Sequence, residues 1–172
     1  FANSVKQSHN SFFPILRLNP TNDAISEVTA HQLLGFTQPL STEASKTSPT
    51  LAVVAPTFDA VIQSSRMGYH NIYADEDGVN RFYRLWEIKD GWKLWSLPAR
   101  VALDQGWILP TEAKQLIHYT QDKNAYTRVS FSEIWSLSQS KQGQAPDDRF
   151  NNSVVIIGST ATSLFDVKVT PI

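Results

Sequence analysis

A length of 172 residues and a hydrophobic fraction of 41% are sufficient for one folded domain with its own core. Fifteen Lys and Arg against 16 Asp and Glu leave a formal net charge of -1, and no basic stretch is interleaved with aromatic residues, which argues against nucleic-acid binding. The absence of cysteine excludes disulfides, thiolate catalysis and sulfur-ligated zinc sites. The longest apolar runs, 51–56 and 154–157, are far shorter than the roughly 20 residues that span a bilayer.

The first part of the chain predicts helices and a strand around a polar segment. A helix tail is expected within 1–9, and the apolar run within 11–18, closed by an Asn-Pro turn signal, predicts a strand. Two prolines and seven Ser or Thr in 37–50 predict an exposed polar loop. Apolar residues at three- and four-residue spacing predict a helix over 56–66, which Gly68 ends.

From residue 69 to residue 95 the apolar period changes to two, which predicts an antiparallel meander. The expected strands are 71–73, 81–86 and 92–95, separated by turns at Asp77-Gly78 and Asp90-Gly91. Ser96 is the expected N-cap of a helix that has Pro98 in its first turn and ends at Gly106. The tryptophans of this region are either an aromatic platform for a ligand or a cover for the sheet.

The last part of the chain predicts a short strand at 116–119 and an amphipathic helix at 130–138. The run 153–158 is apolar on both faces, which is typical of a central strand covered by helices. Together with the absence of internal repeats, these elements predict a single mixed α/β domain over 1–172, with a central sheet, an antiparallel meander and flanking helices. Because the chain starts without a Met and stops directly after an extended segment, we expect it to be part of a longer protein.

Asp75-Glu76-Asp77-Gly78 places carboxylates on a tight turn, as a calcium loop does. A calcium loop that begins at Asp75 needs an oxygen ligand, a glycine and a glutamate at positions that Val79, Asn80 and Trp86 occupy. The match fails, and a hairpin turn with a capping aspartate is the preferred interpretation. The four histidines are too far apart in sequence to form a local ligand motif, so neither a metal site nor a cofactor is predicted.

The turn Gly158-Ser159-Thr160 follows the expected central strand, at the place where α/β proteins bind phosphate groups through free backbone N–H groups. Neither nucleotide-binding fingerprint is complete there. Two interpretations stay open, a small-anion site and a structural glycine that lets the chain turn. No Gly-x-Ser-x-Gly elbow is present, so no catalytic residue is predicted.

Three groups of residues, in one order, resemble a known family. They are Gly68-Tyr69-His70-Asn71 with Asp75-x-Asp77-Gly78-Val79-x-Arg81, then Ser96-Leu97 opening an apolar helix, then Val154-Val155-Ile156-Ile157-Gly158-Ser159-Thr160-Ala161 followed by Asp166 and Thr170-Pro171. The family is the CHASE domain, type two, the cyclase- and histidine-kinase-associated sensory extracellular domain. The family's N-terminal portion and its stretch beyond Thr-Pro have no counterpart, so the chain resembles the C-terminal two thirds of such a domain.

The resemblance implies a non-enzymatic sensory domain, periplasmic or extracellular, on a bacterial inner-membrane receptor that controls a nucleotide cyclase, a diguanylate cyclase or a histidine kinase. It implies membrane tethering in the parent protein and leaves the signal, a small molecule or a protein, unidentified. We expect the domain to act as a homodimer. The alternative is a small α/β hydrolase or transferase fragment that uses the Gly158-Ser159-Thr160 turn.

The residues that carry the resemblance also have a physical interpretation. Asn71, Asp75, Asp77 and Arg81 place an amide, two carboxylates and a guanidinium around the Gly78 turn, which charge-assisted hydrogen bonds can lock. Asp166 follows the Gly158 turn and either caps a backbone segment or receives a ligand cation. The candidate polar sites, each with a structural or a ligand-binding role, are Asn71, Asp75, Asp77, Gly78, Arg81, Gly158, Ser159, Thr160, Asp166 and Thr170.

Overall fold

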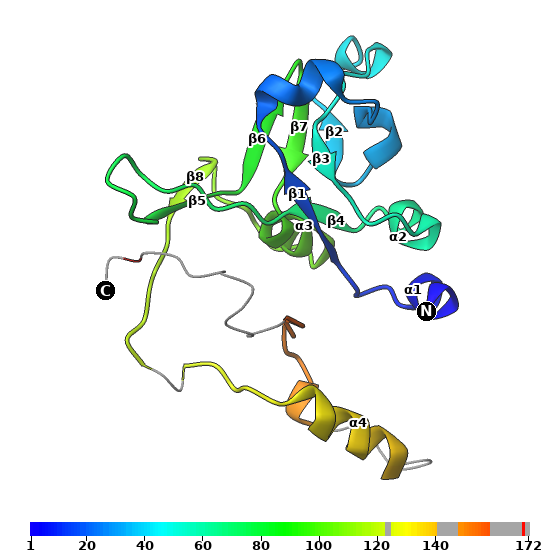
Figure 1. Cartoon of the computed structure of the whole chain (residues 1–172), viewed down its shortest axis with the longest axis vertical. Helices are drawn as coiled ribbons and strands as arrows, with labels where there is room; N and C mark the ends of the chain where they lie inside the picture. The colour runs from blue at the N-terminus through cyan, green and yellow to red at the C-terminus, as the bar shows by residue number, and fades with distance from the viewer. Residues whose placement is uncertain (123–124, 141–147, 159–169, 171–172) are drawn as a thin grey trace. The chain divides into compact units, whose positions relative to one another are not determined.

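The structure is a computed structural model that describes residues 1–122, 125–140, 148–158 and 170 (Figure 1). The chain divides into two compact units, Phe1–Ile117 and His118–Thr170. The predicted mixed α/β class is confirmed, with the strands of the first unit divided among three small sheets.

The first unit contains α-helices, short 3-10 helices and strands that alternate along the chain. In chain order they are α1 (Ala2–Gln7), β1 (Phe13–Arg17), η1 (Pro20–Ile25), η2 (Ala30–Leu33), β2 (Thr37–Pro39), η3 (Ala44–Lys46), β3 (Val53–Val54), α2 (Asp59–Gln63), β4 (Met67–Tyr69), β5 (Phe82–Arg84), β6 (Trp86–Lys89), β7 (Trp92–Trp95), α3 (Leu97–Asp104) and β8 (Lys114–Leu116).

The first sheet has the order β3-β1-β4 and mixes both strand directions. β1 pairs with β3 antiparallel and with β4 parallel, in a register that places Ile15 opposite Tyr69. Ile15 and Arg17 of β1 point to the buried side, while Pro14 and Leu16, which alternate with them, are exposed. This alternation is the period-two pattern of a strand with one buried face.

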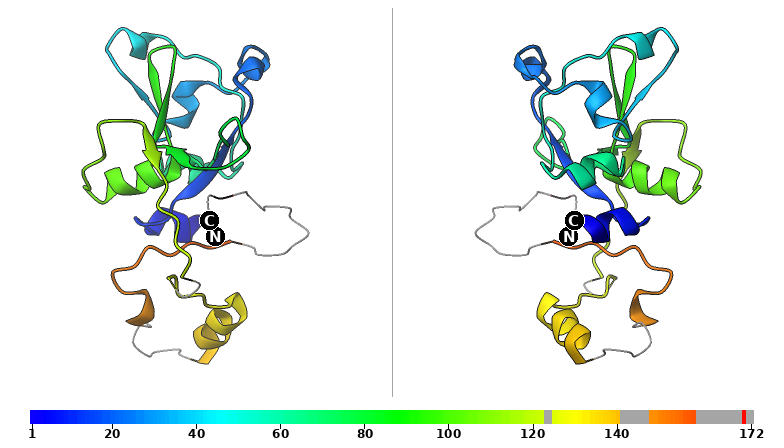
Figure 2. Two further views of the ribbon diagram at one scale, coloured as in Figure 1. Left: turned by 90° about the vertical axis from the view of Figure 1, so that its left-hand side faces the viewer. Right: turned by 90° about the vertical axis from the view of Figure 1, so that its right-hand side faces the viewer.

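The second sheet has the order β2-β7-β6. The turn at Asp90-Gly91 and the strand at 92–95 are as predicted, but the strand before the turn is β6, which shares only Trp86 with the predicted strand 81–86. Asp90 and Gly91 have φ of 48° and 81°, the two positive values that a type I′ hairpin turn requires. The hairpin tip lies next to η3 (Figure 2), where the Trp92 indole N–H donates to the Ala44 carbonyl at 3.1 Å. Trp92 and Trp95 are buried, so they cover the sheet and form no open platform.

The rest of the predicted meander is wrong. Residues 71–73 form no strand, and β5, which lies within the predicted strand 81–86, pairs with β8 in a separate two-stranded sheet instead of with 71–73 and 92–95. The strand expected at 116–119 lies earlier, at Lys114–Leu116, because pairing with β5 sets its bounds.

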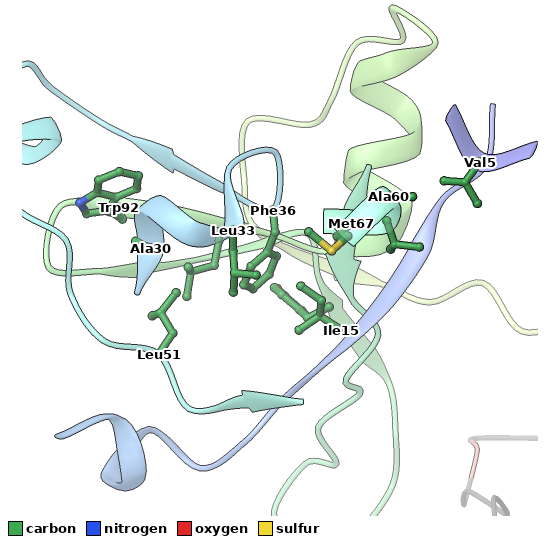
Figure 3. Packing of buried hydrophobic residues seen from close by; sticks show 12 residues of the cluster. Val5, Ile15, Ala30, Leu33, Phe36, Leu51, Ala60, Met67 and Trp92 are labelled. Atoms are coloured by element: carbon green, nitrogen blue, oxygen red, sulfur yellow. The ribbon is translucent and has the colours of Figure 1, made fainter. Parts of the chain in front are cut away.

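Most of the large buried side chains of the first unit form one cluster (Figure 3). Leu33 and Phe36 lie near the middle of the cluster, with Val5 at one end and Trp92 at the other. Because the cluster draws on β1, β4, β7, η2, α1 and α2, it joins the first two sheets through a shared core.

Gly68 does not end a helix as predicted; it lies in β4, and α2 stops earlier, at Gln63. A Cβ atom at Gly68 would come within 2.5 Å of the Leu97 backbone at the start of α3. The glycine is therefore required by the close approach of β4 and α3. The predicted cap of α3 is confirmed, since the Ser96 hydroxyl accepts the Ala99 N–H at 3.3 Å.

The segment 37–50, expected to be an exposed loop, is exposed around Ser41–Glu43 and is structured at its start. Thr37 is buried, and its hydroxyl donates to the carbonyls of Ala30 and Leu33 at 2.6 and 3.1 Å. These bonds hold β2 against η2, a contact that the polar composition of the segment does not reveal.

The second unit contains α4 (Phe131–Ser140) and η4 (Asp148–Phe150), which are joined by an ion pair of 2.8 Å between Arg149 and Glu133. Among the described residues of this unit none is buried. The central strand predicted at 153–158 is wrong in this structure: the segment forms no strand, and Ile156 is 89% exposed. Apolar composition alone does not create a strand when no partner strand pairs with it.

Candidate functional site

A groove of about 590 Å³ opens on the first unit beside the turn at Gly78. Charged side chains of both signs surround it, together with two aromatic rings. Its lining residues are Tyr73, Ala74, Asp75, Glu76, Asp77, Arg81, Phe82, Arg84 and Lys114.

The first wall of the groove is the turn that leads from Asp75 to Arg81. The Gly78 N–H donates to the Asp75 carbonyl at 2.8 Å, and Gly78 has a φ of 80°. Arg81 donates to both oxygens of Asp77 at 2.9 and 2.7 Å and to Asp75 at 3.2 Å. The turn therefore has the charge-assisted lock expected from these residue types.

The lock perturbs the acid–base behaviour of its members. Hydrogen bonds from Arg81 and from the Val79 N–H lower the pKa of Asp77 to about 2. The same contacts with Asp77 and Asp75 raise the pKa of Arg81. At neutral pH the turn therefore carries a charged Arg81 guanidinium bonded to the ionised Asp77 carboxylate.

The second wall of the groove is the β5–β8 ribbon. Arg84 of β5 and Lys114 of β8 are direct cross-strand partners. The Lys114 Nζ lies 4.0 Å from the centre of the Phe82 ring and 4.0 Å from Asp75 Oδ1. Two cations therefore share one face of the ribbon and line the same groove.

Two tyrosines attach this ribbon to the first sheet. The Tyr69 hydroxyl, on β4, donates to the Arg84 carbonyl at 2.8 Å, and the Tyr83 hydroxyl donates to the Tyr69 carbonyl at 3.2 Å. Burial raises the pKa of Tyr83 to about 12, and burial also raises the pKa of Tyr69. Both hydroxyls thus remain protonated donors at physiological pH, so the groove wall is held by neutral hydrogen bonds.

Asn71 is not part of the groove lock, although the sequence grouped it with Asp75 and Arg81. Its side chain donates to the Arg17 carbonyl and accepts the Arg17 N–H, both at 2.8 Å, and so pairs with the end of β1 as a neighbouring strand would. The function of Asn71 in this structure is to hold the segment after β4 against β1.

A second arginine–aspartate pair lies under this contact, and sequence reasoning missed it. Arg17 donates to the two oxygens of Asp23 at 2.7 and 2.8 Å, and the two side chains are only 2% and 6% exposed. Asp23 also accepts the Ala52 N–H at 2.8 Å. The pair therefore fixes β1, η1 and the start of β3 together. In the sequence, the feature that could have indicated this pair is the single arginine, Arg17, at the end of an otherwise apolar strand.

Mutual pairing overcomes the cost of burial for both groups. Burial alone would raise the pKa of Asp23, but hydrogen bonds from Arg17 and Ala52 and the charge of Arg17 outweigh it, and the pKa is lowered. Burial alone would lower the pKa of Arg17, and its bonds with Asp23 reverse this, so the pKa is raised. The pair stays ionised in the folded state.

The other predicted site residues lie in the second unit or outside the described residues. Gly158 ends the exposed 153–158 segment, and open space surrounds the position of a Cβ atom there. Thr170 is half-buried. Ser159, Thr160 and Asp166 lie outside the described residues. Without a strand before Gly158, the strand-to-turn geometry that motivated a hydrolase or transferase reading has no support.

The first unit has a second groove, of about 610 Å³, with a different character. No charged side chain lines it, and its walls come from η2, the segment around β3, and α2. The lining residues are Val28, Gln32, Leu33, Val53, Val54, Ala55, Pro56, Thr57 and Ile62. Of the two grooves, the one beside Gly78 is therefore the one with charge chemistry for a specific ligand.

Within the part of the chain that the structure describes, no three His, Asp or Glu side chains gather closely enough to hold a metal ion. No helix in that part combines the length and apolar character needed to cross a bilayer.

Comparisons with known proteins give the family of the chain. Neither the comparison with curated proteins nor that with solved structures gave a match. The model of the CHASE2 domain matches residues 1–172. CHASE2 domains are sensory and generally non-catalytic, and they are typically extracytoplasmic inputs to cyclases or kinases. The groove beside Gly78 is lined by Asp75, Asp77 and Arg81, which are among the residues that carried the resemblance in the sequence. Because the family model matches residues 1–172, this chain belongs to the CHASE2 family.

Proposed function

We propose that the chain is the periplasmic or extracellular signal-input domain of a membrane-bound bacterial receptor, whose output is a nucleotide cyclase, a diguanylate cyclase or a histidine kinase. The family match over residues 1–172 is the observation that carries this proposal. The groove beside Gly78 supports a binding role, because charged side chains of both signs and two aromatic rings line it.

The proposed receptor works as a homodimer with two arrangements of different output. A ligand shifts the population between them only to the extent that it binds one more tightly than the other. A binding site on a structured wall suits this role, and the β5–β8 ribbon is such a wall, since hydrogen bonds from buried Tyr69 and part-buried Tyr83 attach it to the first sheet.

The compartment is tested by inserting a phosphatase reporter that folds only in the oxidising periplasm into the proposed full-length receptor. The structure places the insertion between Thr42 and Glu43, which are exposed, because Thr37 is buried and Ala44 binds Trp92. We expect high phosphatase activity in intact cells.

The matched control carries a β-galactosidase reporter, which is active in the cytoplasm, at the same position. It should give cells without β-galactosidase activity. The reverse pattern, an inactive phosphatase and an active β-galactosidase, would refute an extracytoplasmic input domain.

A further inference from the structure

The β5–β8 ribbon places two positive charges opposite each other. Arg84 and Lys114 are cross-strand partners and line the same groove. Like charges directly opposite each other destabilise an antiparallel pair unless a counter-charge lies beside them. The cation pair therefore marks a place on the molecule where an anion is stabilised.

The protein supplies only part of that counter-charge. Asp75 is 4.0 Å from Lys114 and also receives a hydrogen bond of 3.2 Å from Arg81. Asp77 is held by two hydrogen bonds from Arg81. In the part of the chain that the structure describes, no carboxylate forms an ion pair with Arg84.

The opposite charge is also available in the groove. Glu76 is exposed, lines the groove, and forms no ion pair within the described residues. The groove as a whole has three carboxylates, Asp75, Glu76 and Asp77, and three cations, Arg81, Arg84 and Lys114. Its formal charge is zero, so a multiply charged anion would be repelled by the carboxylates, while a ligand with one charge of each sign would not.

We propose that the groove binds a small zwitterion of the amino-acid type. Arg84 and Lys114 bind its carboxylate, Glu76 binds its ammonium group, and Tyr73 and Phe82 contact its side chain. A volume of about 590 Å³ is in the range of small-molecule sites. This inference rests on the proposed sensory function and names the ligand class of its site.

The test uses the purified chain and the common free L-amino acids, each at about 1 mM, in thermal unfolding followed by calorimetric titration of those that act. We expect at least one to raise Tm by about 5 °C where its concentration is about a hundred times Kd. Its carboxamide, which lacks the carboxylate, and its N-acetyl derivative, which lacks the ammonium group, should each bind at least about tenfold more weakly.

Two variants assign the binding to the ribbon. Arg84→Gln and Lys114→Gln should each raise Kd about tenfold or more, because a charge-assisted contact is lost. Without ligand, the same variants should have an unchanged or higher Tm, since each removes one of two opposed cations. If either side chain had a purely structural role, its substitution would lower Tm. Arg128→Gln is the control, because Arg128 is exposed and does not line the groove.

The proposal is overturned if no free amino acid shifts Tm, or if Arg84→Gln and Lys114→Gln bind the active amino acid as wild type does. Equal binding of the carboxamide also overturns it. Each of these results leaves the reporter experiment unaffected, so an extracytoplasmic input domain with another ligand class is distinguished from a wrong assignment of the domain itself.

Discussion

Two of the arginine–aspartate pairs in the first unit have almost the same hydrogen bonds but differ in burial. The two Arg17–Asp23 bonds measure 2.7 and 2.8 Å, and the two Arg81–Asp77 bonds measure 2.9 and 2.7 Å. The side chains of the first pair are 2% and 6% exposed, whereas those of the second are 37% and 54% exposed. The comparison teaches that burial, and not bond geometry, decides which pair the fold depends on.

The buried pair also carries more of the surrounding structure. The Thr50 hydroxyl donates to the Asp23 carbonyl, and Asn71 bonds the backbone of Arg17 on both sides. The exposed pair closes one turn only. Loss of Asp23 therefore leaves the buried Arg17 guanidinium without the carboxylate that it donates to, whereas loss of Asp77 leaves Arg81 at a position that is partly exposed to water.

The largest expected effect comes from breaking the buried pair. Asp23→Ala should lower the free energy of unfolding by about 3–5 kcal/mol, because it leaves Arg17 charged and buried without its partner. Urea unfolding of the chain measures this loss. Asp77→Ala is the matched control and should have a much smaller effect; equal losses in the two variants would show that burial does not separate the pairs.

The second effect concerns the turn that the exposed pair closes. Gly78 has a φ of 80°, so Gly78→Val should lower the free energy of unfolding by about 1–3 kcal/mol through backbone strain. No atom lies near the position of the added Cβ, so steric contact adds nothing. Gly78→Asn should cost less, because asparagine tolerates positive φ. Equal Tm values for wild type and Gly78→Val would show that the turn does not need this conformation.

The smallest expected effect is the acid titration of the exposed pair. The folded pKa of Asp77, about 2, is below the ordinary value of 3.8, so its contribution to stability is complete above 3.8 and is lost as the pH falls to about 2. An NMR titration of the Asp77 carboxyl measures the midpoint. Arg81→Gln should move that midpoint up toward 3.8. A midpoint that stays near 2 in Arg81→Gln would assign the shift to the backbone N–H of Val79 instead.

Local signals predicted local structure in this chain. The Asp90-Gly91 turn and the strand after it follow from an Asp-Gly pair beside alternating apolar residues, and the start of α3 follows from Ser96 and Pro98. Each needs only neighbours in sequence. The pairing of β5 with β8 and the absence of a strand at 153–158 depend on partners elsewhere in the chain, which the period of apolar residues does not specify.

In the candidate site, too, contacts between sequence neighbours were predictable, and contacts that depend on strand pairing were not. Asp75, Asp77 and Arg81 lie around one turn, and their charges and spacing predicted the lock that the structure shows. Arg84 and Lys114 come together only through the register of β5 and β8, so no local pattern identifies them. Arg17 and Asp23 were missed because pattern analysis places charged residues at the surface, whereas here the two side chains pair with each other in the interior.

Tyr69 gives the first unit a mechanical constraint. Its hydroxyl holds the carbonyl of Arg84, and its backbone forms a parallel bridge with Ser96, the residue that caps α3. Because Tyr69 is fully buried in β4, beside a glycine that allows direct contact with α3, it has no free volume in which to swing. A displacement of the Arg84 backbone must therefore either break the hydrogen bond from the Tyr69 hydroxyl or move β4 and the first turn of α3 together.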